Sequence, residues 1–196
     1  MIRLGVLGST NGTDLQAVID AILSERLNAC VAVVVSNRVG AFILKRANNH
    51  GVPALFVSHK EKPRENFDKE ITIILKEHQV DLVLLIGFMR ILSSGFCREW
   101  RDRILNVHPS LLPKYAGGMN NSIHKDVLEN KDVETGCTIH LVTEELDAGP
   151  ILVQKRCAVD KRETIASLKA KVQALEGIAL IEAIQIVGET VKQYDI

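Results

Sequence analysis

The chain has 196 residues, of which 46% are hydrophobic and 24% are charged, a composition typical of one packed globular domain rather than of a disordered segment. Lys and Arg number 24, and Asp and Glu number 24, so no bulk charge favours binding to nucleic acid or to an anionic membrane. The longest apolar runs, such as Leu82–Ile86, are too short to cross a bilayer, and the N-terminus lacks the successive regions of a signal peptide. We therefore expect a cytoplasmic protein with a single domain over residues 1–196 and with neither nucleic-acid nor membrane partners.

Strand-like and helix-like segments alternate through the first half of the chain. The apolar segments that resemble buried strands are residues 4–7, 29–35, 54–57, 82–86 and 104–107. Between several of them, apolar side chains recur at helical spacing, in residues 15–23, 40–50 and 64–78. This alternation predicts an α/β protein with a doubly wound, mostly parallel sheet and helices on both faces.

The second half of the chain has a different pattern. Residues 137–142 and part of residues 151–159 alternate apolar and polar side chains, which predicts two further strands, partly antiparallel, at one side of the sheet. Apolar residues then recur at helical spacing from Ile165 to Ala179, and the predicted helix continues toward Val187.

The four cysteines, Cys30, Cys97, Cys137 and Cys157, have neither C-x-x-C nor zinc-site spacing. Three of them, all except Cys97, lie in apolar, strand-like segments, so we interpret them as buried free thiols. No pair of histidines has metal-ligand spacing with a third ligand nearby, and we predict no metal site.

Polar segments follow the predicted strands at the positions where open α/β sheets bind their ligands. The first, GSTNGTD at residues 8–14, precedes a helix, whose backbone N–H groups would suit a phosphate. It is not a P-loop, because no Lys follows Gly12, and no acid at the end of the second strand completes a dinucleotide site. The alternative is a turn in which Thr13 caps the helix.

The sequence NVHPS, residues 106–110, ends the fifth predicted strand. Residues two apart on a strand face the same side, so Asn106 and His108 could address one ligand together. A histidine titrates near neutral pH, and a carboxamide can donate a hydrogen bond to a developing oxyanion. The alternative for His108 is a purely structural role. The loop at residues 143–150 contains three carboxylates and is either a surface turn or the source of a charge that raises the pKa of His108.

Three segments that follow predicted strands together resemble a known family. GFMRILS (87–93), NVHPSLLPKY (106–115) and EELDAGP (144–150), in that order and spacing, are similar to the motifs of the folate-dependent formyltransferases, and the resemblance covers nearly the whole chain. In its short length and its N-terminal loop, the chain resembles the family members that act in purine synthesis. The related methionyl-tRNA formyltransferases and formyltetrahydrofolate deformylases have an additional domain.

The resemblance implies the formyltransferase fold and the transfer of a formyl group from 10-formyltetrahydrofolate to the amine of glycinamide ribonucleotide. It implies two small-molecule substrates, no metal, and a monomer or homodimer. The alternatives are a hydrolase that releases formate from the same folate and a non-catalytic folate- or nucleotide-binding relative.

The resemblance also implies roles for individual residues. The catalytic trio would be Asn106, His108 and Asp147. The folate site would contain Arg64, which meets the glutamate tail, together with Met89, Arg90, Ile91, Leu92, Val142, Thr143, Glu144, Glu145 and Leu146. The ribonucleotide site would contain Asn11, Gly12, Thr13, Asp14, Gln173 and Glu176.

The chain departs from the family's pattern at two places. Asp14 stands where the family commonly has Asn, and an acid in the first turn of a helix is favoured by the helix dipole. We therefore expect the Asp14 carboxylate to stabilise the helix and to compete with a bound phosphate. Residues 116–124 replace a stretch that is three residues shorter in the family, and only His124 aligns well there.

The implied chemistry needs no Ser or Cys nucleophile, because the acceptor amine is itself the nucleophile. Attack on the formyl carbon produces an oxyanion, which Asn106 and protonated His108 would stabilise. Asp147 would hold His108 charged and oriented.

Overall fold

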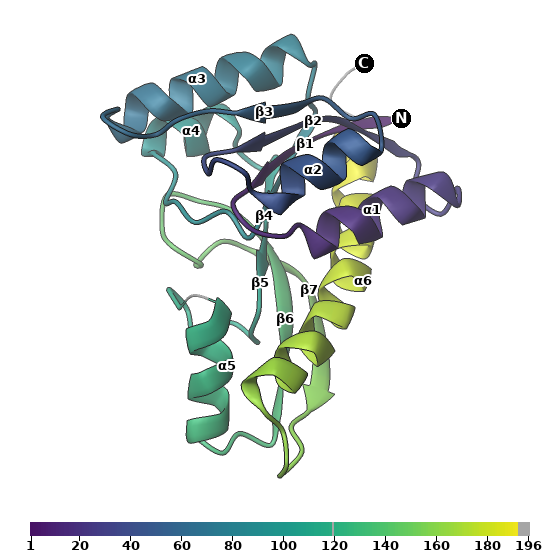
Figure 1. Cartoon of the computed structure of the whole chain (residues 1–196), viewed down its shortest axis with the longest axis vertical. Coiled ribbons are helices and arrows are strands. Elements are labelled where there is room, and N and C mark those ends of the chain that lie inside the picture. Colours follow the sequence, from purple (N-terminus) through teal and green to yellow (C-terminus); the bar gives the residue numbers. More distant parts are fainter. Residues whose placement is uncertain (119, 192–196) are drawn as a thin grey trace.

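A seven-stranded sheet with the strand order β3-β2-β1-β4-β5-β6-β7 forms the centre of the computed structural model, which describes residues 1–118 and 120–191 (Figure 1). The strands are β1 (Ile2–Gly8), β2 (Ala29–Ser36), β3 (Ala54–Phe56), β4 (Leu82–Ile86), β5 (Ile104–His108), β6 (Glu134–Leu141) and β7 (Ile151–Ala158). The first five strands are parallel to one another, whereas β6 is antiparallel to both β5 and β7. The predicted fold class is therefore confirmed. Met119 and residues 192–196 of the predicted unit lie outside the described residues.

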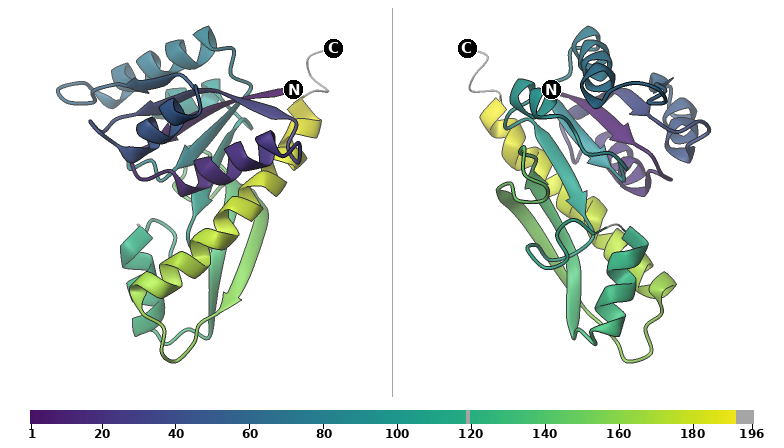
Figure 2. Two further views of the ribbon diagram at one scale, coloured as in Figure 1. Left: turned by 45° about the vertical axis from the view of Figure 1, so that its right-hand side comes forward. Right: turned by 90° about the vertical axis from the view of Figure 1, so that its left-hand side faces the viewer.

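Helices cover both faces of the sheet. Those on one face are α1 (Thr13–Leu23), α2 (Phe42–Asn49) and α6 (Ile165–Val191), and those on the other are α3 (Arg64–Glu77) and α4 (Ser94–Glu99) (Figures 1 and 2). The α3 helix shows how the sequence dictates this arrangement. Its buried side chains Phe67, Ile71 and Leu75 are four residues apart, which places them in one stripe against the sheet.

Two helices were not predicted from the sequence. The α4 helix has only six residues and depends on its N-cap, because the Ser93 side chain accepts a hydrogen bond from the N–H of Phe96 at 3.3 Å. The α5 helix (Asn120–Glu129) buries Ile123 and Val127 against Leu168 of α6, so its stability comes largely from a partner distant in sequence. The final helix also continues to Val191, beyond the expected Val187.

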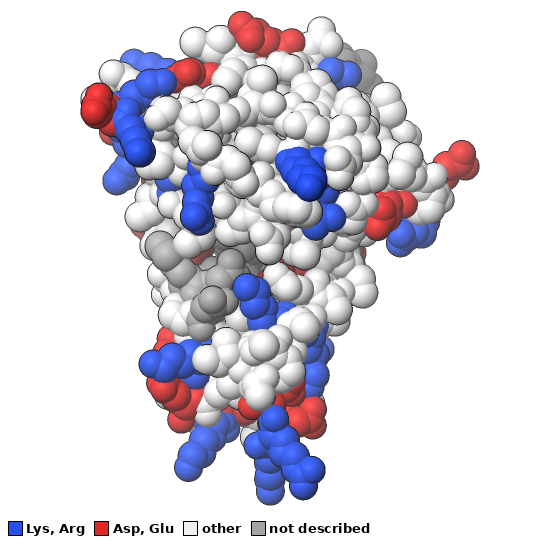
Figure 3. Space-filling view, viewed as in Figure 1, with Lys and Arg blue, Asp and Glu red and all other residues white. Residues whose placement is uncertain are grey.

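The antiparallel strands and α6 extend the molecule in one direction. Figure 2 shows α6 running along β6 and β7, with α5 beside its first turns. At this lower end of the molecule both signs of charge are exposed (Figure 3), and they include the ion pairs Lys125–Glu129 and Arg156–Glu134. Within the described part of the chain, no helix is both long enough and apolar enough to cross a membrane.

The cysteines are all free thiols. Cys137 and Cys97 are buried, whereas Cys30 and Cys157 are only half-buried, so the expectation of burial was wrong for these two. Cys157 lies on β7, which is an edge strand of the sheet and is therefore covered less completely than the centre.

Candidate active site

A cavity of about 400 Å³ opens at the carboxyl ends of β4 and β5. It is lined by the predicted trio of Asn106, His108 and Asp147. All the predicted folate residues except Arg64 also line it, namely Met89, Arg90, Ile91 and Leu92 after β4 and Val142, Thr143, Glu144, Glu145 and Leu146 after β6. Segments far apart in the sequence therefore meet at the edge of the sheet where α/β proteins bind ligands.

Asp147 is at the centre of a polar cluster in this cavity. Its Oδ2 lies 3.4 Å from Nδ1 of His108, and its Oδ1 lies 3.5 Å from Nδ2 of Asn106 and 3.5 Å from Nε2 of His140. The N–H of Gly117 donates to Oδ2 at 2.8 Å. Asp147 has a φ of 52°, a left-handed conformation that Asp tolerates better than most residues. In this backbone conformation the Asp147 carboxylate contacts the rings of His108 and His140 and the side-chain amide of Asn106.

The two ring nitrogens of His108 both face oxygen acceptors. Nδ1 faces Asp147, and Nε2 lies 3.2 Å from the carbonyl oxygen of Tyr115. A doubly protonated ring would satisfy both acceptors. Burial nevertheless lowers the pKa of His108 below its ordinary value, although the Asp147 charge and the Tyr115 carbonyl oppose this effect. Burial therefore favours the neutral ring, which is placed to accept a proton during the reaction.

Asp147 itself stays ionised. Burial alone would raise its pKa, but the contacts with His140, the N–H of Gly117 and the nearby histidine rings hold this pKa below its ordinary value. As expected, the Asp147 carboxylate faces His108 and raises the pKa of its ring, but burial has the larger effect and the net pKa lies below the ordinary value.

His140 is the site residue that the sequence analysis missed. It lies opposite Asn106 in the antiparallel pairing of β5 and β6, and its Nε2 lies 3.1 Å from Nδ2 of Asn106. His140 is almost fully buried, at 1% exposure. Only the register of two strands separated by 25 residues of intervening chain brings it to the site, so the sequence pattern gave no local signal for it.

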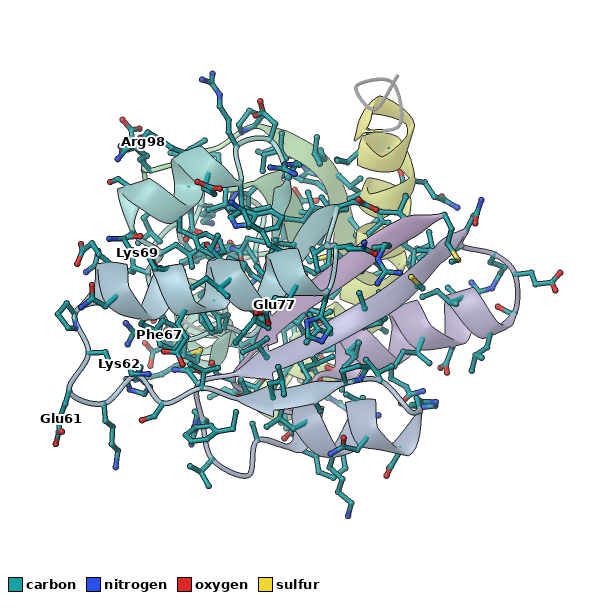
Figure 4. The ribbon with its side chains drawn as sticks, turned by 90° about the horizontal axis from the view of Figure 1, so that it is seen from above. Glu61, Lys62, Phe67, Lys69, Glu77 and Arg98 are labelled. Atoms are coloured by element: carbon teal, nitrogen blue, oxygen red, sulfur yellow. The ribbon has the colours of Figure 1, made fainter. Side chains whose placement is uncertain are left out.

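The wall formed by the segment after β4 is apolar at its surface. Met89 and Ile91 are exposed, whereas Leu92 is buried. The Arg90 guanidinium lies 4.6 Å from the centre of the Phe67 ring, and its buried Nε has no hydrogen-bond partner among the described residues. Phe67, on α3, is labelled in Figure 4. This cation–π contact restrains the Arg90 side chain, and its unpartnered Nε leaves a donor available to a ligand.

The loop after β6 forms another wall of the cavity and is joined to α4 by an ion pair. Arg98, also labelled in Figure 4, forms an ion pair with Glu144 at 3.2 Å. Arg64, in contrast, does not line the cavity: it is exposed at the first position of α3. A ligand would reach Arg64 only by extending out of the cavity toward α3.

A second, smaller cavity of about 30 Å³ lies beside the start of α1. Its lining includes four of the predicted ribonucleotide residues, Thr13, Asp14, Gln173 and Glu176, together with Thr10. Asn11 and Gly12 do not line it and form the turn that leads into the helix.

The turn before α1 depends on glycine. Gly12 has a φ of 66°, and a Cβ at this position would lie 2.4 Å from Ile43. Gly12 also occupies the N-cap position, and no side chain caps the helix, so the interpretation of Thr13 as the cap was wrong. The first N–H groups of α1 therefore have no side-chain acceptor and are available to an anion.

Asp14 and Glu176 are buried carboxyl groups, at 6% and 5% exposure. Burial raises the pKa of Asp14 to about 7. Burial and the neighbouring charge of Asp14 together raise the pKa of Glu176 to about 8, although Lys169 opposes this. Burial of Asp14 therefore works against the expected stabilisation of the helix start by its carboxylate.

Ser9 connects the two cavities. Its hydroxyl donates to Oδ1 of Asn37 at 2.6 Å and accepts the N–H of Met89 at 3.0 Å, while its own N–H donates to the carbonyl of Gly87 at 3.2 Å. The loop before α1 and the loop after β4 are thus held in one arrangement. Gly87 and Val107 line both cavities, so the two cavities adjoin.

His124, on the longer 116–124 segment, does not join the cluster. It is fully buried on α5, and burial lowers its pKa to about 4. Across residues 1–118 and 120–191, no three His, Cys, Asp or Glu side chains gather in a group that could hold a metal ion.

Comparison with known proteins gives a consistent result. The family described as formyl transferase matches residues 2–184. The chain is 41% identical over 189 residues to the trifunctional purine biosynthetic protein adenosine-3 of Chironomus tentans, an alignment that covers 95% of this chain and 14% of the relative. It is also 40% identical over 176 residues to the phosphoribosylglycinamide formyltransferase of Escherichia coli, with 90% of this chain and 82% of the relative covered.

Among solved structures, the glycinamide ribonucleotide transformylase 1 of Symbiobacterium toebii superposes with a TM-score of 0.92 at 38% identity, covering 97% of this chain and 89% of that protein. The chain spans less than a fifth of the trifunctional relatives, 14% of the Chironomus protein and 18% of the human one. It matches one segment of those relatives and most of the length of the single-function bacterial proteins.

Proposed function

This chain belongs to the formyl transferase family, and on that premise we propose that it transfers the formyl group of 10-formyltetrahydrofolate to the primary amine of glycinamide ribonucleotide, a step of purine biosynthesis. The observation that carries the proposal is the meeting of the two cavities at Gly87 and Val107. Val107 lines both cavities and lies between Asn106 and His108 in the sequence. A donor in one cavity and an acceptor in the other would therefore present their reacting atoms to these two side chains.

The larger cavity suits the folate. Its apolar wall at Met89 and Ile91 offers a surface for aromatic rings, and the backbone of Arg90 and Leu92 offers donors and acceptors to ring nitrogens. The glutamate tail would leave the cavity toward Arg64. A solvent-exposed ion pair there contributes only about 0–1 kcal/mol, so the cavity provides most of the affinity.

The smaller cavity suits the acceptor. The N–H groups at the start of α1 would bind the phosphate, and Gln173 and Glu176 of α6 would bind the sugar hydroxyls. Because the loop before α1 is bonded through Ser9 to the loop after β4, the two substrates would be held in a fixed relative position.

The reaction uses the cluster around Asp147. The amine nitrogen forms a bond to the formyl carbon, and the carbonyl electron pair moves to the oxygen. Asn106 donates a hydrogen bond to this oxyanion through Nδ2, whose 3.5 Å contact with Asp147 is long enough to be exchanged for a ligand. His108 accepts the proton that the attacking nitrogen loses, and the imidazolium then lies 3.4 Å from the Asp147 carboxylate.

The tetrahedral centre then collapses. The carbonyl re-forms and the bond to the folate nitrogen breaks, and that nitrogen takes up the one proton that the attacking nitrogen lost to His108. A group that exchanges a proton near neutral pH serves both transfers, directly or through water. We assign this role to His108.

Absorbance of the folate product, followed with and without glycinamide ribonucleotide, tests the proposal. We expect folate turnover only when the acceptor is present. Equal turnover without the acceptor would identify a hydrolase instead, and binding of both ligands without turnover would identify a non-catalytic relative.

A further inference from the structure

Two carboxyl groups from different helices face the same small cavity. Asp14 is the second residue of α1, and Glu176 lies in the middle of α6. The two helices approach closely, because a Cβ at Gly177 would lie 2.6 Å from the Cβ of Ala17. This contact fixes the two acids in one cavity of about 30 Å³, which is too small for either group to be fully hydrated.

The surroundings provide little compensation for two negative charges. Oδ1 of Asp14 is buried and has no hydrogen-bond partner among the described residues. The charged and titratable groups of the neighbouring elements are Lys169, on α6, which favours ionised Glu176, and Cys137, on β6. On α2, Arg46 binds the carbonyl of Asn11 at 3.2 Å. Like charges in one desolvated site are not both formed near neutral pH, so the pair holds a proton.

A phosphate bound at the start of α1 would add further negative charge beside these two carboxyl groups. The second ionisation of a phosphate ester has a pKa of about 6, so the ligand is a dianion above neutral pH. Asp14 lies in the first turn of the helix, beside the N–H groups that would bind this dianion, whereas the charge of Lys169, earlier on α6, favours ionised Glu176. The dianion therefore opposes ionisation of Asp14 more strongly than ionisation of Glu176.

We infer that Asp14 binds the phosphate-bearing acceptor as a neutral carboxylic acid while Glu176 remains ionised, so that the acceptor and one proton bind together. The inference rests on the proposed function, because it takes the smaller cavity as the acceptor subsite. A protonated Asp14 has one O–H donor and one carbonyl acceptor, so like a carboxamide it can both donate and accept a hydrogen bond. The O–H donates to a phosphate oxygen, and the Glu176 carboxylate accepts the hydroxyls of the sugar.

The inference predicts a specific pH dependence of binding. Above the pH at which the free pair loses its proton, each pH unit should weaken binding of a sugar phosphate about tenfold, because one proton must be taken up with each ligand. An Asn at position 14 is permanently neutral and keeps a donor, so binding to Asp14→Asn should be independent of pH in this range. Asp20→Asn is the matched control, because Asp20 lies on the same helix but is exposed.

Calorimetric titration with ribose 5-phosphate at pH 6 to 9, in buffers of different ionisation enthalpy, measures both quantities. At pH 9 we expect uptake of about one proton by the wild-type protein and by Asp20→Asn, and none by Asp14→Asn. Ribose without phosphate should show no proton uptake. A difference infrared spectrum of the wild-type protein at pH 8.5 should show the carbonyl band of a protonated acid on ligand binding, which tests the inference without any variant.

Three results would overturn the inference: wild-type affinity that is constant from pH 7 to 9, proton uptake that persists in Asp14→Asn, or no binding of ribose 5-phosphate at any pH. The formyl-transfer assay is independent of this measurement. Proton-linked binding without formyl transfer would contradict the proposed function alone, and formyl transfer with proton-independent binding would contradict the inference alone.

Discussion

Replacing Asp147 with Asn isolates the contribution of its charge to the reaction. The carboxamide has nearly the same shape and keeps an oxygen that can accept the N–H of Gly117, which donates to Asp147 at 2.8 Å. The carboxylate lies 3.4 Å from Nδ1 of His108. Two opposite unit charges at that separation attract each other by about 5 kcal/mol at an effective dielectric constant of about 20. Because burial favours the neutral form of His108, this attraction develops as the ring gains its proton.

The measurable loss is smaller than the full attraction, since the amide dipole and relaxation of the cluster replace part of it. Removing one partner of a buried, hydrogen-bonded charge pair costs about 2–5 kcal/mol. At about 1.4 kcal/mol for each factor of ten, we expect Asp147→Asn to lower kcat by about 30- to 4,000-fold. The KM for folate should change by less than about threefold, because the interaction is made mainly in the transition state.

Single-turnover kinetics, followed by the absorbance of the folate product, measures this loss directly. Glu134→Gln is the matched control, because it removes a carboxylate from the surface pair with Arg156, away from the site. A kcat for Asp147→Asn within about threefold of the wild-type value would refute the transition-state role. A loss confined to KM would mean that Asp147 binds folate and does not act on His108.

Three further predictions follow from the site and its burial. His108→Gln should lower kcat by about 10²-fold or more with folate affinity retained, as single-turnover rates and a fluorescence titration will report, and near-normal turnover would exclude the assigned role. Arg64→Ala should weaken folate binding by about 0–1 kcal/mol, with an effect that shrinks at high salt, whereas loss of all binding would require a differently built folate site. For Asp14, whose folded pKa is raised from 3.8 to about 7, the contribution to stability is full below pH 4 and is lost as the pH rises through 7. The melting temperature of Asp14→Asn relative to that of the wild type should therefore rise between pH 5 and pH 8, by about 2–4 °C for each kcal/mol of stability that the wild type loses. A difference in melting temperature that is the same at both pH values would mean that Asp14 titrates normally.

The parallel part of the fold follows from local sequence because its strands are buried on both faces. Leu82–Ile86 is apolar throughout and forms β4 with the predicted limits. The helices that were missed depend on contacts that a local pattern does not contain. The α5 helix needs Leu168 as a packing partner, and α4 needs the Ser93 cap and the burial of Phe96.

The site was predictable to the extent that its residues share one strand. Asn106 and His108 are two apart on β5, and the period of a strand places them on one side. The contacts of Asp147 and His140 depend instead on the register of β5 with β6 and on a left-handed backbone at Asp147. The protonation states of His108 and Asp14 depend on burial, which is set by tertiary packing and cannot be read from residue type alone.

The most direct test of the account follows the fate of the formyl carbon. Folate labelled with carbon-13 in its formyl group is incubated with the protein and glycinamide ribonucleotide, and the products are identified by NMR. The account predicts that the label appears in an amide of the ribonucleotide, in amounts equal to the deformylated folate produced, and that His108→Gln slows its appearance about 10²-fold or more. Label found in free formate, at the same rate with and without the ribonucleotide, would contradict it.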